Sequence, residues 1–190
     1  MLSPPHDRAR SRHGKLKQFT LALATGAALV ALNVAPAQAG DGGTGTSNPD
    51  VTTGQATLRD GKAIPPSDAP SRVVGVIDAA NRIAKGKDYC YGGGHLSFKS
   101  SCYDCSGSVS YALHGGRFLD TPMDSSGLMR WARHGKGKWI TVFANRGHAF
   151  MVVAGLRFDT AMTRGSGPGW SEDIHAEDWR DFRKRHKGRF

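Results

Sequence analysis

The apolar residues in the middle of the chain recur at helical spacing in two segments. Over residues 71–85 they return every three or four positions, which is typical of a helix with one buried face. Residues 105–113 repeat this pattern directly after Asp104, a residue type that favours helix N-caps. The pattern therefore predicts two helices, the second of which begins at a cysteine. A third, shorter helix is expected over residues 121–133.

The later part of the chain changes to short runs of β-branched and aromatic residues. Three such runs, separated by glycine-containing turns, predict strands over residues 139–143, 148–153 and 157–161. Helices that come first, followed by neighbouring strands, predict an α+β domain in which a helix packs on an antiparallel sheet.

Residues 1–39 have the pattern of a secretory signal peptide. A basic stretch precedes an apolar run, and small residues then form a cleavage pattern with the cut expected after Ala39. An uncleaved membrane anchor is the alternative, but the apolar run is shorter than the ~20 residues that a spanning helix needs. The mature protein is therefore expected outside the cytoplasm.

The rest of the chain divides into three parts by composition. Residues 40–70 are rich in Gly, Thr, Ser, Asp and Pro without any period, which is typical of a disordered linker. The periodic segments occupy residues 71–170, the expected folded domain. Residues 171–190 end in a basic run, and the spacing of Trp179 and Phe182 makes a helix one candidate structure for this tail.

The chain is basic, with 26 Lys and Arg against 16 Asp and Glu and a net charge of +10. A basic protein attracts nucleic acids, anionic membranes or polyanionic wall polymers. Export would remove nucleic acid from the expected partners, so extracellular polyanions remain.

Three cysteines lie close together in the sequence, and Cys105 has the most suggestive surroundings. It falls in the first turn of the expected second helix, where the helix dipole stabilises a thiolate. In an oxidising compartment an odd count leaves one cysteine over. Cys105 is therefore the candidate nucleophile, and Cys90 and Cys102 are candidates for a disulfide.

Two other uses of these cysteines stay open at this point. A bridge or redox pair between Cys102 and Cys105 would block the nucleophile. Alternatively, Cys90, His95, Cys102 and Cys105 together would satisfy tetrahedral zinc, although their spacing fits no common zinc finger. With Cys105 as nucleophile, neither a metal nor an organic cofactor is expected.

A thiolate nucleophile needs a base within hydrogen-bond reach, and His148 is the candidate. It opens an apolar strand directly after a glycine turn, where a side chain at the rim of a sheet can meet the N-terminus of a packed helix. The other histidines lie in the leader, the tail or loops and connections that contain glycine. The alternative for His148 is a purely structural role.

Three short motifs, in this order, resemble the NlpC/P60 family of papain-like cell-wall peptidases. Residues 89–93, Tyr-Cys-Tyr-Gly-Gly, are similar to the family's Tyr-x-Trp-Gly-Gly, and residues 104–107, Asp-Cys-Ser-Gly, resemble its nucleophile motif. Gly147 and His148 precede an apolar strand, as in the family. The resemblance covers residues 71–170 and implies a papain-like fold, with Cys105 on a helix packed against the antiparallel sheet that carries the histidine.

The resemblance also implies an activity and further site residues. It implies that the protein is a cysteine peptidase and that it cleaves bonds involving D-amino acids in the stem peptides of peptidoglycan. Tyr89 matches the family's active-site tyrosine, and Asp104 and Ser106 match positions that often hold the free amine of the substrate. A monomer that acts at the cell wall is expected, with anionic wall polymers as further partners of the basic tail.

The third catalytic position departs from the family pattern. About twelve positions after the histidine the family has a polar residue, often His, and here Thr160 stands at that position. Its neighbour Asp159 is chemically the better partner for an imidazole, but the two point to opposite faces of a strand. If His148 pairs directly with Thr160 across the hairpin, Asp159 would need a bulge to reach the histidine, so Thr160 is the predicted residue.

Two other functions keep the same fold. One is a catalytically idle module that only binds the wall, and the other is an amidase or acyltransferase that uses Cys105 and His148 on a different substrate. Loss of peptidoglycan turnover when the thiol is blocked would distinguish a hydrolase from the idle module. The products of the reaction would distinguish a peptidase from an amidase or acyltransferase.

Overall fold

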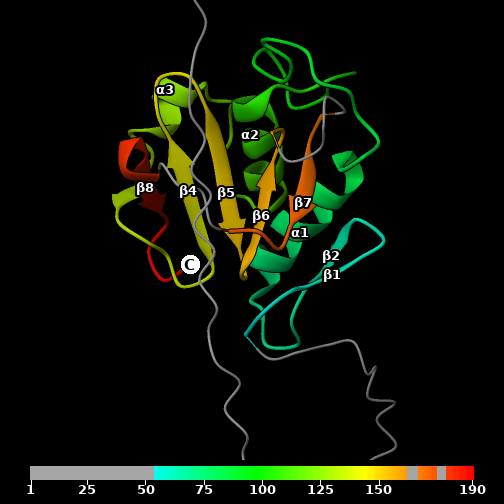
Figure 1. The fold of residues 1–190 in the computed structure, drawn as a ribbon. Coiled ribbons are helices and arrows are strands. Elements are labelled where there is room, and N and C mark those ends of the chain that lie inside the picture. Colours follow the sequence, from blue (N-terminus) through cyan, green and yellow to red (C-terminus); the bar gives the residue numbers. More distant parts are fainter. Residues whose placement is uncertain (1–53, 162–166, 175–178) are drawn as a thin grey trace, which may run out of the picture. The chain divides into compact units, whose positions relative to one another are not determined.

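The computed structural model describes residues 54–161, 167–174 and 179–190. Two helices cover one face of an antiparallel sheet, so the predicted α+β class is confirmed (Figure 1). The helical segments are α1 (Ser71–Ile83), α2 (Cys105–Gly115), α3 (Ser125–Leu128) and the 3₁₀ turn η1 (Trp179–Asp181). The strands are β1 (Thr57–Arg59), β2 (Lys62–Ile64), β3 (Arg133–His134), β4 (Ile140–Ala144), β5 (Ala149–Val153), β6 (Leu156–Asp159), β7 (Gly169–Ser171) and β8 (Arg183–His186).

The main sheet has six strands in the order β3-β8-β4-β5-β6-β7, and each pair of neighbours is antiparallel. β4 to β7 follow one another along the chain. Between β5 and β6 the hairpin turns through Ala154 and Gly155, whose φ angles of 45° and 84° are the left-handed pair of a type I′ turn. β8, from the end of the chain, lies between β3 and β4.

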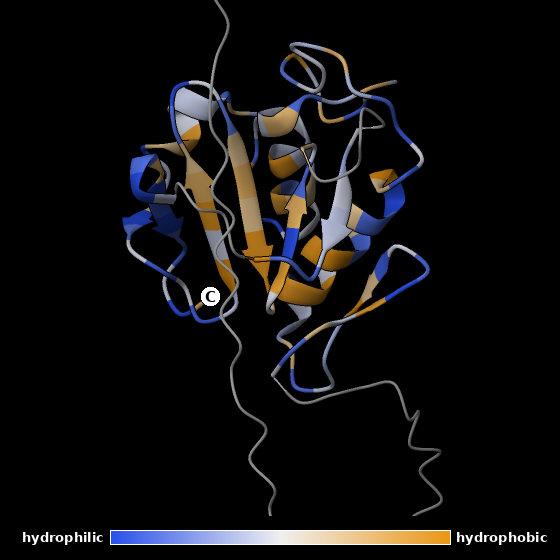
Figure 2. Ribbon diagram, viewed as in Figure 1, coloured by the Kyte–Doolittle hydropathy of each residue, from blue (hydrophilic) through white to orange (hydrophobic). Residues whose placement is uncertain are grey.

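One face of this sheet forms the main core with the helices. Val142, Met151 and Phe158 lie opposite one another on β4, β5 and β6, and all three are fully buried. The apolar faces of α1 and α2 belong to the same core, which Figure 2 shows as orange on the central strands and the helices. Each fully buried side chain of this kind contributes about 1.5–3 kcal/mol to stability.

The opposite face of the sheet is closed by the end of the chain. Phe143 and Phe150 are buried there, with ring centroids 4.8 Å apart. Trp179 lies 4.6 Å from Phe143, and Phe182 lies 5.2 Å from Phe150. The segment just before β8 is therefore part of the domain's packing.

Several elements differ from the sequence predictions. The segment predicted as a linker holds the β1–β2 hairpin in its described part, and Ala56 N–H donates to the carbonyl of Ala154. The predicted third helix shortens to α3, which begins after Asp124, whose carboxylate caps it. In its described part, the basic tail forms the short 3₁₀ turn η1 at Trp179–Asp181 and then the strand β8, because β4 offers backbone partners to this strand.

The predicted signal peptide lies outside the described residues. Within the described ranges, no helix is long and apolar enough to cross a membrane.

Candidate functional site

Cys105 is the first residue of α2, and the turn before it is held by a buried carboxylate. Asp104 caps the helix and accepts the N–H of Gly107 at 2.7 Å. The loop over residues 90–102 crosses this first turn so closely that a Cβ on Gly107 would lie 1.9 Å from the carbonyl oxygen of Gly93. Glycine at position 107 therefore lets the loop pack against the nucleophile's helix.

The structure contains a disulfide between Cys90 and Cys102, with Cα atoms 5.6 Å apart. Cys105 is left as a free, partly buried thiol. Because both other cysteines are bonded to each other, neither can bridge to Cys105 or offer a thiolate to zinc. The described residues also contain no cluster of three metal-ligating side chains. In the chain-entropy model, closing a loop of this length stabilises the fold by about 3 kcal/mol.

His148 is positioned by the turn between β4 and β5. The side-chain oxygen of Asn145 accepts the N–H groups of Gly147 at 2.9 Å and His148 at 2.8 Å, which fixes the backbone just before β5. The imidazole Nε2 lies 2.8 Å from Oδ1 of Asp159. Since Nε2 is engaged there, Nδ1 is the ring nitrogen left to serve the Cys105 thiol.

The structure contradicts the prediction that Thr160 contacts His148, because Asp159 does so. The register explains the difference: Met151 lies opposite Phe158, one position away from the pairing that the prediction assumed. In this register, Asp159 lies on the same face as His148 and reaches it diagonally, without any bulge. Across the described residues, no hydrogen bond joins Thr160 to the histidine.

Arg157 is a site residue that the sequence reasoning missed. It lies two positions before Asp159 on the same face, and its Nε and Nη2 donate to Oδ2 at 3.1 and 2.5 Å. Both side chains are buried, and the guanidinium stacks over Phe150 at 4.2 Å. The signal was an arginine and an aspartate at i and i+2 in an otherwise apolar strand, where charges need a partner.

The charges around His148 favour its protonated form. Burial alone would lower the pKa of His148, but hydrogen bonds with Asp159 and Cys105, together with the negative charges of these groups, raise it from 6.5 to about 9. Burial would raise the pKa of Asp159. The hydrogen bond and charge of His148, the N–H of Ala161 and the charge of Arg157 outweigh this burial and lower it. At neutral pH the pair therefore consists of an imidazolium and a buried carboxylate.

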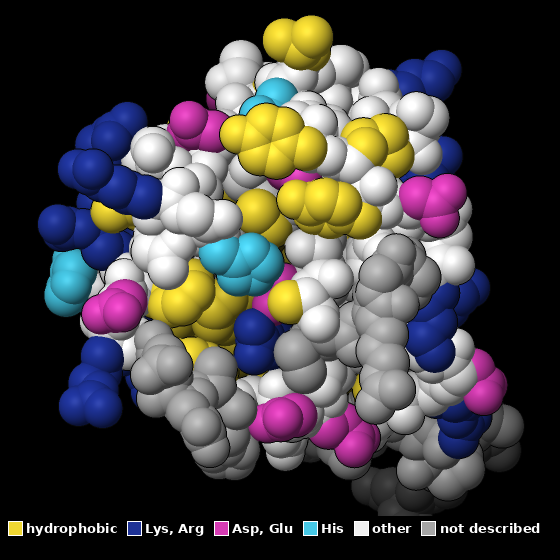
Figure 3. All heavy atoms as spheres, turned by 45° about the horizontal axis from the view of Figure 1, so that its top comes forward, with side chains coloured by type: hydrophobic (Ala, Val, Ile, Leu, Met, Phe, Trp, Pro, Cys, Tyr) yellow, Lys and Arg dark blue, Asp and Glu magenta, His cyan; other side chains and the backbone are white. Residues whose placement is uncertain are grey.

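A pocket of about 350 Å³ opens beside the thiol. Its lining includes Tyr89, Tyr91 and Cys105, and also Ser125 and Arg146. Figure 3 faces this end of the sheet, and histidine and hydrophobic side chains gather around its centre. Tyr89 is half-exposed here, and burial followed by the nearby charges of Cys105 and Asp104 raises its pKa.

Asp104 and Ser106, predicted from the resemblance, contact a third residue of the pocket lining, His95. His95 Nε2 lies 2.8 Å from Oδ2 of Asp104 and 2.9 Å from the Ser106 hydroxyl. Oδ1 accepts from Ser106 and Gly107, and Oδ2 also accepts the N–H of Gly92. Both oxygens of the carboxylate therefore have two partners. From the sequence, His95 was a candidate zinc ligand. Its position in the loop between Cys90 and Cys102 could have indicated that it lies beside Asp104.

Comparison with known proteins yields structural likenesses alone. No protein-family model matches the chain, and no curated protein matches it. One similar structure is the P60 domain of an antigen from M. avium subspecies paratuberculosis, which is 16% identical over 60% of this chain and 94% of that chain, with a TM-score of 0.45. Another is a lipoprotein-like protein of the NLP/P60 family from Staphylococcus aureus, which is 19% identical with a TM-score of 0.42. That match covers 63% of this chain and 43% of the other.

Proposed function

We propose that the protein is a secreted cysteine peptidase that cleaves stem-peptide bonds of bacterial peptidoglycan. One observation carries the proposal: the free thiol of Cys105, at a helix N-terminus, is hydrogen-bonded to His148, whose Nε2 is in turn hydrogen-bonded to the buried carboxylate of Asp159. Nucleophile, base and orienting group are the three parts of covalent acyl transfer. The choice of peptidoglycan rests on the motifs at 89–93, 104–107 and 147–148.

The first half of the reaction transfers the acyl group to Cys105. The thiolate attacks the peptide carbonyl carbon and forms a C–S bond. The backbone N–H of Cys105, at the start of α2, is available to stabilise the oxyanion, because the first N–H groups of a helix have no partner within it. His148 then gives its proton to the leaving nitrogen, and the C–N bond breaks.

The second half releases the acyl group to water. Neutral His148 takes a proton from the attacking water, which forms a C–O bond with the thioester carbon. The C–S bond breaks, the thiolate returns and a carboxylic acid leaves. Asp159 stays ionised throughout and holds the imidazole in the tautomer that faces Cys105.

Alkylation of the thiol separates this hydrolase from a module that only binds the wall. Iodoacetamide should label Cys105 alone in the oxidised protein, since Cys90 and Cys102 are bonded. We expect labelling to abolish the release of soluble peptides from purified peptidoglycan while binding to the same sacculi persists. Unchanged release after complete labelling would overturn the proposal.

A further inference from the structure

Three neighbouring cavities lie at the end of α2 that is remote from Cys105. The largest, about 420 Å³, is lined by Arg72, Arg133, Lys187 and Arg189. A second, about 390 Å³, continues from Arg189 to Lys138. A third, about 270 Å³, continues from Arg72 to Arg117. Because adjacent cavities share a lining arginine, we treat these six side chains as one basic groove.

The basic groove is separate from the catalytic pocket. It contacts Gly115 and Gly116 at the C-terminal end of α2, whereas Cys105 lies at the N-terminal end. A helix of 11 residues is about 16 Å long, so no single small ligand touches both sites.

Separate parts of the fold bring these cations together. The pairing of β3 with β8 places Arg133 opposite His186, directly before Lys187 and Arg189. Arg72 lies in the first turn of α1, and its guanidinium donates hydrogen bonds to the carbonyls of Gly116 and Arg117, which hold it in place. The groove therefore has one fixed arginine and several exposed cations around it.

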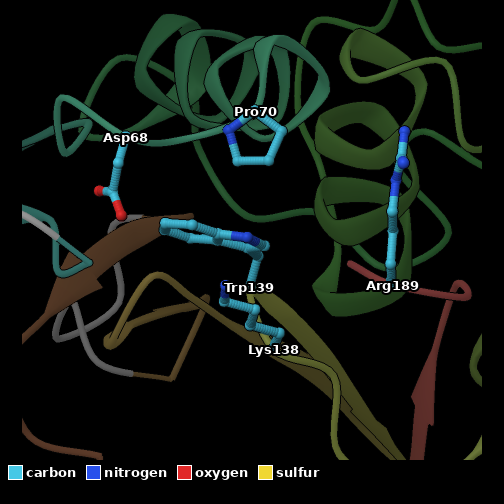
Figure 4. Close-up of a pocket in the computed structure, with 5 residues that line it drawn as sticks. All are labelled: Asp68, Pro70, Lys138, Trp139 and Arg189. Carbon is cyan, nitrogen blue, oxygen red and sulfur yellow. The ribbon is translucent and has the colours of Figure 1, made fainter.

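The charge of the groove is nearly all of one sign. In the part of the chain that the structure describes, none of the six cations forms an ion pair with a carboxylate. The acidic side chain in the lining is Asp68, and it already accepts the N–H of Gly54 at 2.6 Å. In the close-up of this part, the ring of Trp139 lies between Asp68 and Lys138 (Figure 4).

We propose that this groove binds a linear phosphodiester polymer of the bacterial cell wall. Cations that line neighbouring cavities match a chain of evenly spaced anions, because each phosphate can contact a cation and release its counterions. Figure 3 shows Lys and Arg side chains along the left edge of the face, on the side where Figure 1 places β8. Together these cations would hold the protein on the wall while the catalytic pocket stays open.

A polymer fits this surface better than an anionic membrane does. Peripheral membrane binding combines basic residues with apolar side chains that enter the lipid. Among the described residues, the exposed large hydrophobic side chains are Tyr89, Tyr91 and Leu96, all in or next to the disulfide loop by the catalytic pocket. None of them lines the basic groove, so the groove offers a membrane none of these apolar side chains to insert.

The test compares two triple variants with equal changes in net charge. The groove variant carries Arg133→Gln, Lys187→Gln and Arg189→Gln, and the control carries Lys62→Gln, Lys85→Gln and Lys99→Gln. All six residues are exposed. Binding of soluble poly(glycerol phosphate) is measured by fluorescence anisotropy at several salt concentrations, and thermal unfolding checks that both variants fold.

We expect the groove variant to bind at least about tenfold more weakly, with the slope of log K against log salt reduced by about 2 for three lost contacts. The control should keep the wild-type slope, and both variants should keep their activity on soluble peptides. An equal loss in both variants would overturn the proposal, as would binding to phosphatidylglycerol vesicles with none to the polymer.

Discussion

At the scale of single residues, the chemistry of His148 depends on charges that lie behind it. Asp159 is fully buried, yet it stays ionised because the imidazole contacts one oxygen and Arg157 contacts the other. A carboxylate without such partners would protonate on burial. Both candidates for the third position, Asp159 and Thr160, could be identified from the sequence. The choice between them required the strand register, because a shift of one residue changes which of them faces the histidine.

The first prediction compares the two rivals for that position. Asp159→Asn should lower kcat/KM by about 10²–10⁴-fold, because the amide no longer holds the productive tautomer of His148. Thr160→Val, at a site with no hydrogen bond to His148 among the described residues, should change kcat/KM by less than about threefold. Release of peptides from purified peptidoglycan measures both rates, after thermal unfolding has shown that both variants fold. The reverse order of effects would contradict the site geometry.

The second prediction concerns pH. Because the pKa of folded His148 is raised to about 9, its imidazolium is charged at neutral pH and loses its proton as the pH rises through 9. Activity that needs this proton for the leaving amine should therefore fall above pH 9. The contribution of protonated His148 to the free energy of unfolding should be fully present below its unfolded pKa of 6.5, and it should be lost as the pH rises from 6.5 to about 9.

Profiles of peptidase activity from pH 5 to 10.5 check this prediction. The wild-type protein is compared with Asp159→Glu, a variant that keeps a carboxylate at this position. A falling limb near the ordinary histidine value of about 6.5 in the wild-type protein would contradict the charge arrangement around His148.

At the scale of elements, α2 is the best predicted part of the molecule because local rules define it. Both its first residue and its cap were readable from Asp104 and the apolar spacing after it. β8 was not readable, because its four residues are polar and its partner β4 is 39 positions earlier in the chain. Strand pairing of this kind depends on a vacant sheet edge, which no local pattern reports.

The third prediction tests the cap of α2. Asp104→Ala should lower the free energy of unfolding by about 2 kcal/mol or more, because it removes a buried carboxylate with four partners. This carboxylate accepts hydrogen bonds from Gly92, Gly107 and Ser106 and contacts the imidazole of His95. Asp124→Ala is the matched control. It removes the cap of α3, where the exposed carboxylate accepts the N–H of Gly127 at 2.6 Å, and should cost about 1 kcal/mol or less.

Urea unfolding of both variants decides the matter. Equal losses of stability would mean that the cluster around Asp104 contributes nothing beyond an ordinary helix cap.

At the scale of the whole molecule, the end of the chain completes the domain and borders the catalytic site. The ring of Phe182 lies 6.3 Å from His148 and 5.2 Å from Phe150. From the sequence, Phe182 and Trp179 suggested a helical face. Their actual role, covering the second face of the sheet, required knowing that this face carries Phe143 and Phe150.

The fourth prediction follows from that packing. Phe182→Ala should lower the free energy of unfolding by about 1–3 kcal/mol, because a partly buried ring is removed from an aromatic cluster. It should also reduce activity, since His148 loses one of its walls. Leu96→Ala, at a fully exposed position, should change stability by less than about 0.5 kcal/mol. Denaturant unfolding would contradict this account if the two variants behaved alike.

The central claim is that Cys105 cleaves stem-peptide bonds, and mass spectrometry of muropeptides tests it most directly. Purified peptidoglycan is incubated with the wild-type protein or with Cys105→Ala, a change that removes only the sulfur from a partly buried position. We predict new peptide fragments with masses of stem-peptide hydrolysis products in the wild-type digest, and none with Cys105→Ala. The same fragments in both digests, or intact stem peptides in both, would contradict the claim.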